Sequence, residues 1–426
     1  MTALIVSHGH PRFNKGGAEI AAYRLYQALR NSKGWENSAF LAACPDDGML
    51  KPGCELHGLS NSEWLVRRSA DPLLHDTNLN LTRTEHGFLY HALKDLHPTV
   101  IHIHHYVHIG LDLVHALKRW FPRAKVIFTL HEYWGMCPYE GRLLKRNGKF
   151  CNGPEPDACA SCVGGKEIRI KLAVRRLRIQ HFFSVIDQLI SPSHFLKNRY
   201  VNWGFASESI AVVENLPVAS FESSATSDCH HVVSKDSIPP LIFAYFGQIN
   251  RWKGIDLILE AFSLALTKHP TIQLELHGLS RESLFEDQNF HDPIFLTTCR
   301  ELIKKLPPES VRLMGAYEPQ ETAARLKRVD ILIMASRWYE NAPMVIQEAF
   351  SNGVPVIAPN YGGMAEKIKH KVTGLLYGSP GIDILADSLL WIAEDSGLLK
   401  EMSHNAKKNA LSVDSVFEEH IALYEK

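Results

Sequence analysis

The chain has 426 residues, and its 46 lysines and arginines balance its 46 aspartates and glutamates, which leaves no formal net charge at pH 7. That balance excludes the strong positive field of a nucleic-acid-binding protein, and no nucleic-acid partner is expected. The length exceeds what one hydrophobic core usually supports, so two or three domains are expected. Neither a signal-peptide pattern nor an apolar run of ~20 residues is present, so a cytoplasmic protein is predicted.

The first half alternates short apolar runs with longer amphipathic stretches. Strands are predicted at 3–7, 38–43, 100–104, 125–130 and 187–191. These runs are continuously apolar rather than alternating, as in parallel strands that are buried on both faces. Helices are predicted at 18–29 and after Ser193, a good N-cap residue, with Gly204 suited to the end of the second helix.

Residues 218–240 interrupt this alternation, because they are rich in serine and end in two prolines. We interpret them as a linker between domains at 1–217 and 241–405. The second half then alternates again, with strands predicted at 241–246, 272–277, 311–314, 330–335 and 354–358 and a helix at 255–266. Two such halves predict an α/β protein with two doubly wound domains facing a cleft, where ligands bind at the carboxyl ends of the strands.

Two glutamates separated by seven residues, Glu340 and Glu348, follow the strand predicted at 330–335. Glu340 falls in the loop, and Glu348 falls inside the next helix. Unpaired N–H groups at Met344 and Val345, near the start of that helix, would favour an anion. The two carboxylates could bracket a nucleotide sugar by accepting hydrogen bonds from its hydroxyls. Alone, the pair also fits two ordinary charges, one solvated and one on a helix surface.

The order of motifs around these glutamates resembles the retaining GT-B glycosyltransferases of family 4. The resemblance extends from Tyr245 to about Tyr377 and covers the turn with Lys253, the two glutamates and the Gly362-Gly363 turn. The first half matches more weakly, through Gly16-Gly17-Ala18-Glu19, His131-Glu132-Tyr133 and Asn215. The GT-B fold consists of two Rossmann-like domains, as the alternation also predicts.

The resemblance implies roles for individual residues. Glu340 would contact the transferred sugar, Glu348 the ribose, and Lys253 the donor diphosphate. The family usually has arginine where this chain has Gln248. Arg251, three residues further on, would either supply the missing cation or simply be exposed.

In the first half, Gly16 and Gly17 resemble the glycine loop that approaches the donor phosphates, and His131 matches a histidine that contacts the donor sugar. The glycines do not form a G-x-G-x-x-G fingerprint, which argues against a dinucleotide-dependent redox enzyme. The predicted catalytic residues are Glu340, His131 and Lys253. The predicted donor-binding residues are Gly16, Gly17, Gln248, Arg251, Lys253, Glu340, Asn341, Met344, Val345, Glu348, Gly362 and Gly363.

The function implied is transfer of a hexose-type sugar, with retention of configuration, from a nucleotide-diphosphate sugar to a glycan or lipid-linked acceptor in polysaccharide biosynthesis. No catalytic cofactor is expected. The second domain would hold the donor and the first the acceptor, while residues 406–426 would form a helix that packs back on the first domain. Two alternatives stay open: a nucleotide-sugar epimerase or phosphorylase of the same fold, and a non-catalytic nucleotide-sugar-binding protein.

Four cysteines gather in one stretch rich in glycine and proline: Cys137, Cys151, Cys159 and Cys162. A C-x-x-C pair with two further cysteines suits a structural zinc ion bound by four thiolates. Separately buried cysteines, or a redox-active pair, would give the same pattern. Because the stretch closely follows His131, we expect it to fold over the acceptor side of the cleft.

Residues 166–179 interleave basic and apolar side chains, which predicts a basic amphipathic helix. Such a helix can lie on an anionic membrane, here the inner face, as a lipid-linked acceptor would require. The alternative is the solvated face of an ordinary packed helix.

Overall fold

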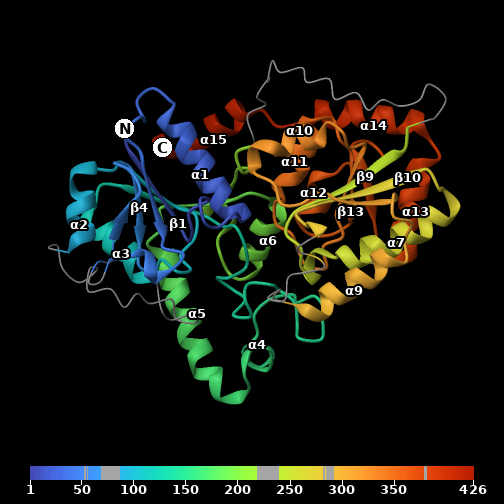
Figure 1. Cartoon of the computed structure of the whole chain (residues 1–426). Coiled ribbons are helices and arrows are strands. Elements are labelled where there is room, and N and C mark those ends of the chain that lie inside the picture. The colour runs from blue at the N-terminus through green and yellow to red at the C-terminus, as the bar shows by residue number, and fades with distance from the viewer. Residues whose placement is uncertain are drawn as a thin grey trace. The chain divides into compact units, whose positions relative to one another are not determined.

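The computed structural model describes residues 1–51, 54, 56–68, 87–217, 239–281, 284, 292–378 and 381–426. The chain divides into two compact units (Figure 1). Unit 1 comprises Met1–Leu216 and Val413–Lys426, and unit 2 comprises Pro217–Ser412. Of the linker predicted at 218–240, residues 218–238 lie outside the described part. Among the described residues, no helix is both long enough and apolar enough to cross a bilayer.

Unit 1 is built on one sheet with the strand order β3-β4-β2-β1-β5-β6-β7-β8, in which only β3 runs antiparallel to its neighbour. The strands are β1 (Ala3–Ser7), β2 (Ala39–Ala43), β3 (Leu56–Gly58), β4 (Glu63–Val66), β5 (Val100–Ile103), β6 (Lys125–Thr129), β7 (Gln188–Ser191) and β8 (Ile210–Val212). The helices are α1 (Gly17–Arg30), α2 (Phe88–Leu93), α3 (Leu111–Trp120), α4 (Pro156–Val163), α5 (Arg169–Ser184), α6 (His194–Asn202) and α15 (Val413–Glu425).

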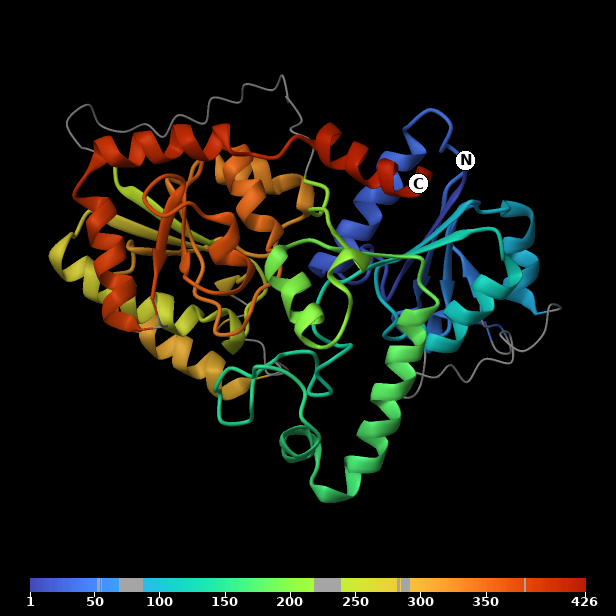
Figure 2. The ribbon, with the colours of Figure 1, turned by 180° about the vertical axis from the view of Figure 1, so that it is seen from behind.

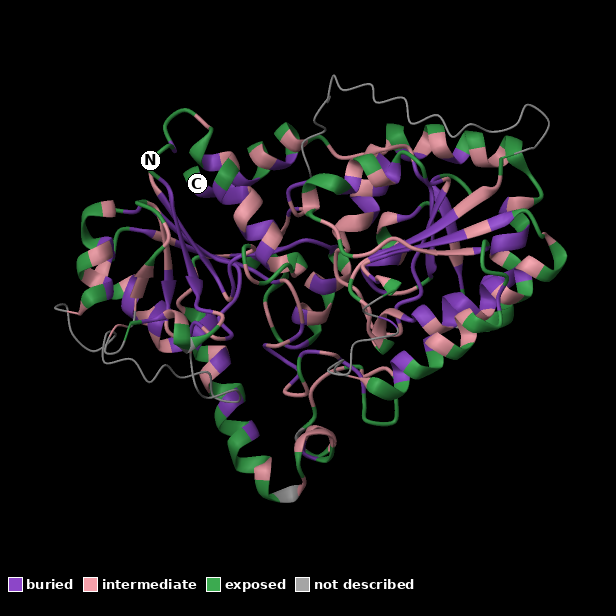
Figure 3. Cartoon of the chain, in the orientation of Figure 1, coloured by how far each residue is buried: buried purple, intermediate pink, exposed green. Residues whose placement is uncertain are grey.

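The five strands predicted for the first half are confirmed to within a residue at each end. They are almost wholly buried, as Figure 3 shows, so each reads as an uninterrupted apolar run. β3, β4 and β8 were not predicted, because each is short and only partly buried. The helix predicted after Ser193 is also confirmed, and the Ser193 hydroxyl accepts from the backbone N–H of Leu196 at 3.2 Å.

The last helix, α15, belongs to unit 1 although the chain has already passed through unit 2. The hydroxyl of Tyr424 lies 2.6 Å from Nδ1 of His102, and Nζ of Lys125 donates to the carbonyl of Leu423 at 2.7 Å. Both views place α15, in red, beside α1, in blue (Figure 1, Figure 2).

Unit 2 is built on a sheet with the order β11-β10-β9-β12-β13-β14, in which all neighbours are parallel. The strands are β9 (Leu241–Phe246), β10 (Ile272–His277), β11 (Val311–Leu313), β12 (Ile331–Ile333), β13 (Val356–Pro359) and β14 (Gly374–Tyr377). The helices are α7 (Ile255–Lys268), α9 (Pro293–Lys304), α10 (Thr322–Leu326), α11 (Met344–Ser351), α12 (Gly362–Lys367), α13 (Ile382–Ala393) and α14 (Ser396–Lys408).

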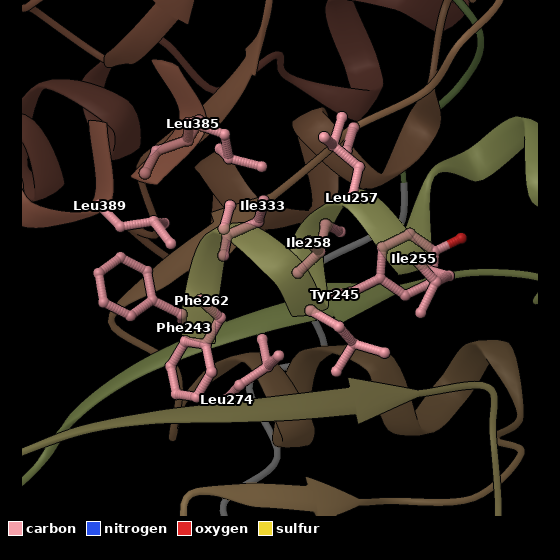
Figure 4. Packing of buried hydrophobic residues seen from close by; sticks show 14 of the residues in the cluster. Phe243, Tyr245, Ile255, Leu257, Ile258, Phe262, Leu274, Ile333, Leu385 and Leu389 are labelled. Atoms are coloured by element: carbon pink, nitrogen blue, oxygen red, sulfur yellow. The ribbon is translucent and has the colours of Figure 1, made fainter. Parts of the chain in front are cut away.

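Both faces of the unit 2 sheet are covered by helices. Phe243 on one face packs with Phe262 of α7 and Leu389 of α13 (Figure 4), whereas its neighbour Ala244 packs in the cluster that contains Phe350 of α11. This double burial explains the continuous apolar strands and confirms the prediction of two doubly wound α/β domains.

Candidate functional site

Lys253 stands at the carboxyl end of β9, in a short 3₁₀ helix that spans Arg251–Lys253. The side-chain oxygen of Asn250 accepts from the backbone N–H groups of Trp252, at 3.0 Å, and Lys253, at 3.1 Å. This cap holds the turn in place before α7 begins, so the Lys253 side chain is presented from a fixed backbone.

Glu340 lies in the loop between β12 and α11, and three donors converge on its Oε1 atom. They are Nζ of Lys253 at 2.6 Å, Nε1 of Trp338 at 2.7 Å and Oγ of Ser336 at 2.8 Å. The Glu340 side chain is 11% exposed and that of Lys253 is 22% exposed. The structure therefore brings together two of the predicted catalytic residues and adds Ser336 and Trp338, which the sequence did not indicate.

The charge of Glu340 follows from these contacts. Burial would raise the pKa of the carboxyl, but attraction to Lys253 and the hydrogen bonds from Lys253, Trp338 and Ser336 outweigh it and lower the pKa below its usual value. Glu340 is thus a carboxylate at neutral pH. The site combines a fixed negative charge and a fixed positive charge at the carboxyl edge of the sheet.

The Gly362-Gly363 turn packs directly against the Glu340 loop, and the N–H of Gly363 donates to the carbonyl of Glu340 at 2.6 Å. A Cβ at Gly363 would lie 1.6 Å from the carbonyl oxygen of Asn341, where no side chain fits. Gly362 has φ +65°, and a Cβ there would lie 2.7 Å from the carbonyl oxygen of Glu340. Both glycines are thus required to position the loop, independently of any ligand.

The other predicted residues of unit 2 are arranged around this loop. Met344 and Val345 open α11, and Val345 also packs against the core. Glu348 lies in the middle of α11 and is half-buried. Burial, and next the nearby charge of Glu348, raise the pKa of Tyr317.

Arg251, the candidate cation in the sequence, is paired with a carboxylate, and so is Arg337 in the loop before Glu340. Nε of Arg251 lies 2.5 Å from Asp292, and the Arg251 side chain is 48% exposed. Nη1 of Arg337 lies 2.9 Å from both carboxylate oxygens of Asp256. Gln248 is exposed, and its carbonyl accepts from the Tyr245 hydroxyl at 2.7 Å. The contact to Glu340 is therefore made by Lys253 and not by these arginines.

Gly16, Gly17 and His131 belong to unit 1. Gly16 lies just before α1, and a Cβ on it would lie 2.3 Å from the Glu19 carboxylate. A Cβ on Gly17 would meet nothing within 4 Å. The Glu19 carboxylate lies 3.2 Å from Nε2 of His8, a pairing that the sequence reasoning missed although Glu19 is part of the glycine motif.

His131 lies at the carboxyl end of β6 beside other histidines. Its Nε2 atom lies 2.9 Å from Nδ1 of His104, and the two rings stack with centroids 5.1 Å apart. Burial, followed by the neighbouring His105 and His8, lowers the pKa of His131 to about 3. His131 is thus a neutral imidazole whose orientation is set by His104.

Glu132, the residue after His131, is hydrogen-bonded to His105. Burial raises the pKa of Glu132 to about 8 and lowers that of His105 well below its usual value. In the adjacent pair of His8 and Glu19, the pKa of the histidine is raised instead. Burial would lower it, but the hydrogen bond and the charge of Glu19 outweigh burial. Unit 1 therefore contains an ion pair, His8 with Glu19, next to a neutral pair, His105 with Glu132.

The cysteine stretch forms an extended loop followed by α4. The backbone N–H of Cys151 donates to the carbonyl of Leu143 at 2.8 Å, and Cys159 and Cys162 both lie in α4. Burial, and then the neighbouring cysteines Cys137, Cys151 and Cys162, raise the pKa of Cys159 to about 11. Within the described part of the chain, however, no three His, Cys, Asp or Glu residues are arranged to hold a metal ion.

Two family descriptions match the chain. "Glycosyltransferase Family 4" matches residues 15–216, and "Glycosyl transferases group 1" matches residues 233–409. The chain belongs to the family 4 glycosyltransferases of group 1. The second match includes Lys253, Glu340 and the Gly362-Gly363 turn, and the first includes Gly16, Gly17 and His131.

Two curated relatives each match about two fifths of this chain. The putative glycosyltransferase YtcC of Bacillus subtilis is 27% identical over 172 residues, which is 39% of this chain and 40% of YtcC. The D-inositol 3-phosphate glycosyltransferase of Kribbella flavida is 26% identical over 174 residues, 40% of this chain and 39% of that enzyme. The matched part thus spans well under two thirds of these relatives.

Solved structures confirm the GT-B fold over the whole chain. The sucrose-phosphate synthase of Thermosynechococcus elongatus has a TM-score of 0.66 at 20% identity, and covers 100% of this chain and 98% of its own. The Anabaena protein Alr3699/HepE in complex with UDP has a TM-score of 0.65 at 17% identity, and covers 100% of both chains.

Proposed function

We propose that this chain is a retaining glycosyltransferase that takes a hexose-type sugar from a nucleotide-diphosphate sugar bound by unit 2. The observation that carries the proposal is the convergence of Lys253, Trp338 and Ser336 on Glu340 at the carboxyl edge of the sheet. Ligands of doubly wound domains bind at this edge. A cation beside a carboxylate suits a donor that is anionic at one end and rich in hydroxyls at the other.

Each residue then has a role that its surroundings support. The Lys253 ammonium stabilises the charge that develops on the diphosphate as the sugar departs. Glu340, being ionised, is a poor general acid and instead faces the positive charge that develops at the anomeric carbon. Glu348 accepts hydrogen bonds from the ribose. No covalent nucleophile is assigned, because departure and attack on the same face retain the configuration.

The acceptor belongs to unit 1 in this proposal. It is a glycan or a lipid-linked glycan, as in polysaccharide biosynthesis, and a lipid-linked acceptor would bring the enzyme to the inner face of a membrane. His131, Gly16 and Gly17 would reach the donor from this unit. Because His131 is neutral, it can donate one hydrogen bond to a sugar hydroxyl without adding a charge.

A structural zinc ion bound by Cys137, Cys151, Cys159 and Cys162 is part of the same proposal. It would tie the loop to α4, in addition to the packing of buried loop residues such as Met136 and Leu143. Metal analysis of the purified protein tests it, and about one equivalent of zinc is expected for one four-thiolate site. Trace amounts, or no change in content on replacing Cys159 and Cys162 by serine, would disprove the site.

A thermal-shift screen against nucleotide-diphosphate sugars tests the function. UDP-glucose comes first, because a protein of the same fold from Anabaena was solved with it. A true donor at about a hundred times its Kd adds about 2.7 kcal/mol of stability. Proton NMR of the transfer product then gives the anomeric configuration, which should equal that of the donor.

The same assays separate the alternatives. An epimerase changes the donor without any acceptor, a phosphorylase requires inorganic phosphate, and a non-catalytic protein binds the donor without turnover. No stabilisation by any donor, or equal stabilisation of the Lys253→Ala variant, would refute the proposed site.

A further inference from the structure

We infer that one face of α5 docks on an anionic lipid surface. Three of its large apolar side chains are exposed: Ile170 at 78%, Leu177 at 67% and Val174 at 41%. Their spacing of four and three residues places them on one stripe of the helix. Ile170 is more exposed than any other large hydrophobic residue in the described part of the chain.

This stripe is not the face by which α5 packs in unit 1. The buried residues of the helix are Leu172, Arg175, Ile179, Phe182 and Phe183. At 3.6 residues per turn, their centre lies roughly 170° around the helix from the exposed stripe. The buried guanidinium of Arg175 donates to the carbonyl of Gly135 at 3.0 Å, which anchors α5 from the inner side. The helix thus carries two apolar faces, and packing accounts for one of them.

Basic side chains flank the exposed stripe on both sides. Lys171 and Arg178 lie roughly 70–100° to one side of it, and Arg169 and Arg176 lie roughly 100–130° to the other. Lys171, Arg169 and Arg176 are exposed, and Arg169 also lies 2.8 Å from Asp157 of α4. Figure 3 shows exposed residues along this first part of α5, which extends away from the sheet of unit 1. The alternative, an ordinary solvated face, would not place Ile170, the most exposed isoleucine among the described residues, on one stripe with a valine and a leucine.

The charge pattern indicates which partner covers this face of α5, a lipid surface or a second copy of the chain. An apolar stripe bordered by cations matches a surface with apolar chains beneath anionic headgroups, because lysine and arginine can reach the headgroups while the stripe enters the acyl boundary. A second copy of α5 would instead bring two rows of like charge together. The inference extends the proposed function, since a lipid-linked acceptor lies at a membrane, but it is tested without donor or acceptor, so either can fail alone.

Flotation of the full chain with vesicles tests the docking face. Binding is expected to phosphatidylcholine vesicles that contain phosphatidylglycerol, to be much weaker with phosphatidylcholine alone, and to fall as salt rises. Ile170→Ser with Leu177→Ser should reduce retention at least about tenfold. Lys171→Gln with Arg176→Gln should reduce the partition coefficient roughly fivefold for each charge.

Ile294→Ser is the matched control, because Ile294 is 75% exposed on α9 of unit 2 and has no part in the proposed face. It should bind vesicles like the parent chain. Thermal melts establish that every variant is folded. Unchanged retention of the Ile170→Ser, Leu177→Ser variant would overturn the inference. So would a dimer, measured by light scattering without lipid, that this variant converts to a monomer, since the stripe would then be a self-association surface.

Discussion

Nζ of Lys253 lies 2.6 Å from Oε1 of Glu340, although 87 positions separate the two residues. Parallel strands produce this proximity, because β9 and β12 are neighbours and both end at the same edge of the sheet. A bound diphosphate would offer Lys253 a second anionic partner, and the Glu340 carboxylate would then be shared between the lysine and the sugar. The pair would therefore contact both the diphosphate of the donor and the sugar that is transferred.

Replacing either member of this pair should impair transfer in different ways. Lys253→Ala removes the cation that stabilises the leaving diphosphate, so kcat should fall roughly 10²-fold or more. Glu340→Gln keeps the shape but removes the negative charge, so kcat should fall with little change in donor KM. Steady-state kinetics with saturating acceptor measure both. Near-parental turnover in both variants would show that the site lies elsewhere.

Arg251 provides a control of the same charge in the same turn. Its guanidinium is paired with Asp292 and half-exposed, so Arg251→Ala should change kcat/KM for the donor less than about fivefold. Asp292→Asn should behave similarly. A loss as large as that of Lys253→Ala would show that Arg251 leaves Asp292 to bind the donor and supplies the cation missing at Gln248.

Substitutions of Gly17 and Gly363 distinguish a glycine that the packing of the protein requires from a glycine that contacts the donor. Gly363→Ala places a Cβ 1.6 Å from the Asn341 carbonyl, so it should displace the Glu340 loop and lower stability by about 1–3 kcal/mol. Gly17→Ala meets nothing within 4 Å, so the melting temperature should not fall. A higher donor KM in Gly17→Ala would then report phosphates in contact with Gly17. An unchanged KM would remove Gly17 from the donor site.

Much of the fold follows from the sequence because buried parallel strands are continuous apolar runs. Residues 241–246 illustrate this, since β9 has the predicted bounds. β4 was missed because its run, Glu63–Val66, begins with polar and half-exposed positions. The site was only partly predictable, since motifs indicated Lys253 and Glu340 but not what holds them. Trp338 is two residues from Glu340 in the same loop, and only the folded backbone shows that its indole turns back to the carboxylate.

The buried histidines of unit 1 predict that its stability decreases in acid. Burial lowers the pKa of His420 to about 4 and lowers those of His102 and His104 well below 6.5. An unfolded chain binds protons at these histidines near pH 6.5, whereas the folded chain does not, so their contribution is present above 6.5 and is lost as pH falls. The raised pKa of His8 acts oppositely, with a contribution that is lost as pH rises above 6.5.

Each histidine kept neutral costs about 1.4 kcal/mol per pH unit below its unfolded pKa. Thermal unfolding followed from about pH 7.5 to about pH 5 should therefore show a steep decrease in melting temperature. His420→Asn should lower stability at neutral pH, because the bond from Nε2 to the Glu214 carbonyl is lost, yet make the decrease in acid shallower. The helix α15 also depends on this region through Tyr424. An equally steep decrease in His420→Asn would mean that protonation of His420 does not contribute, and that the loss arises from His102, His104 or other groups.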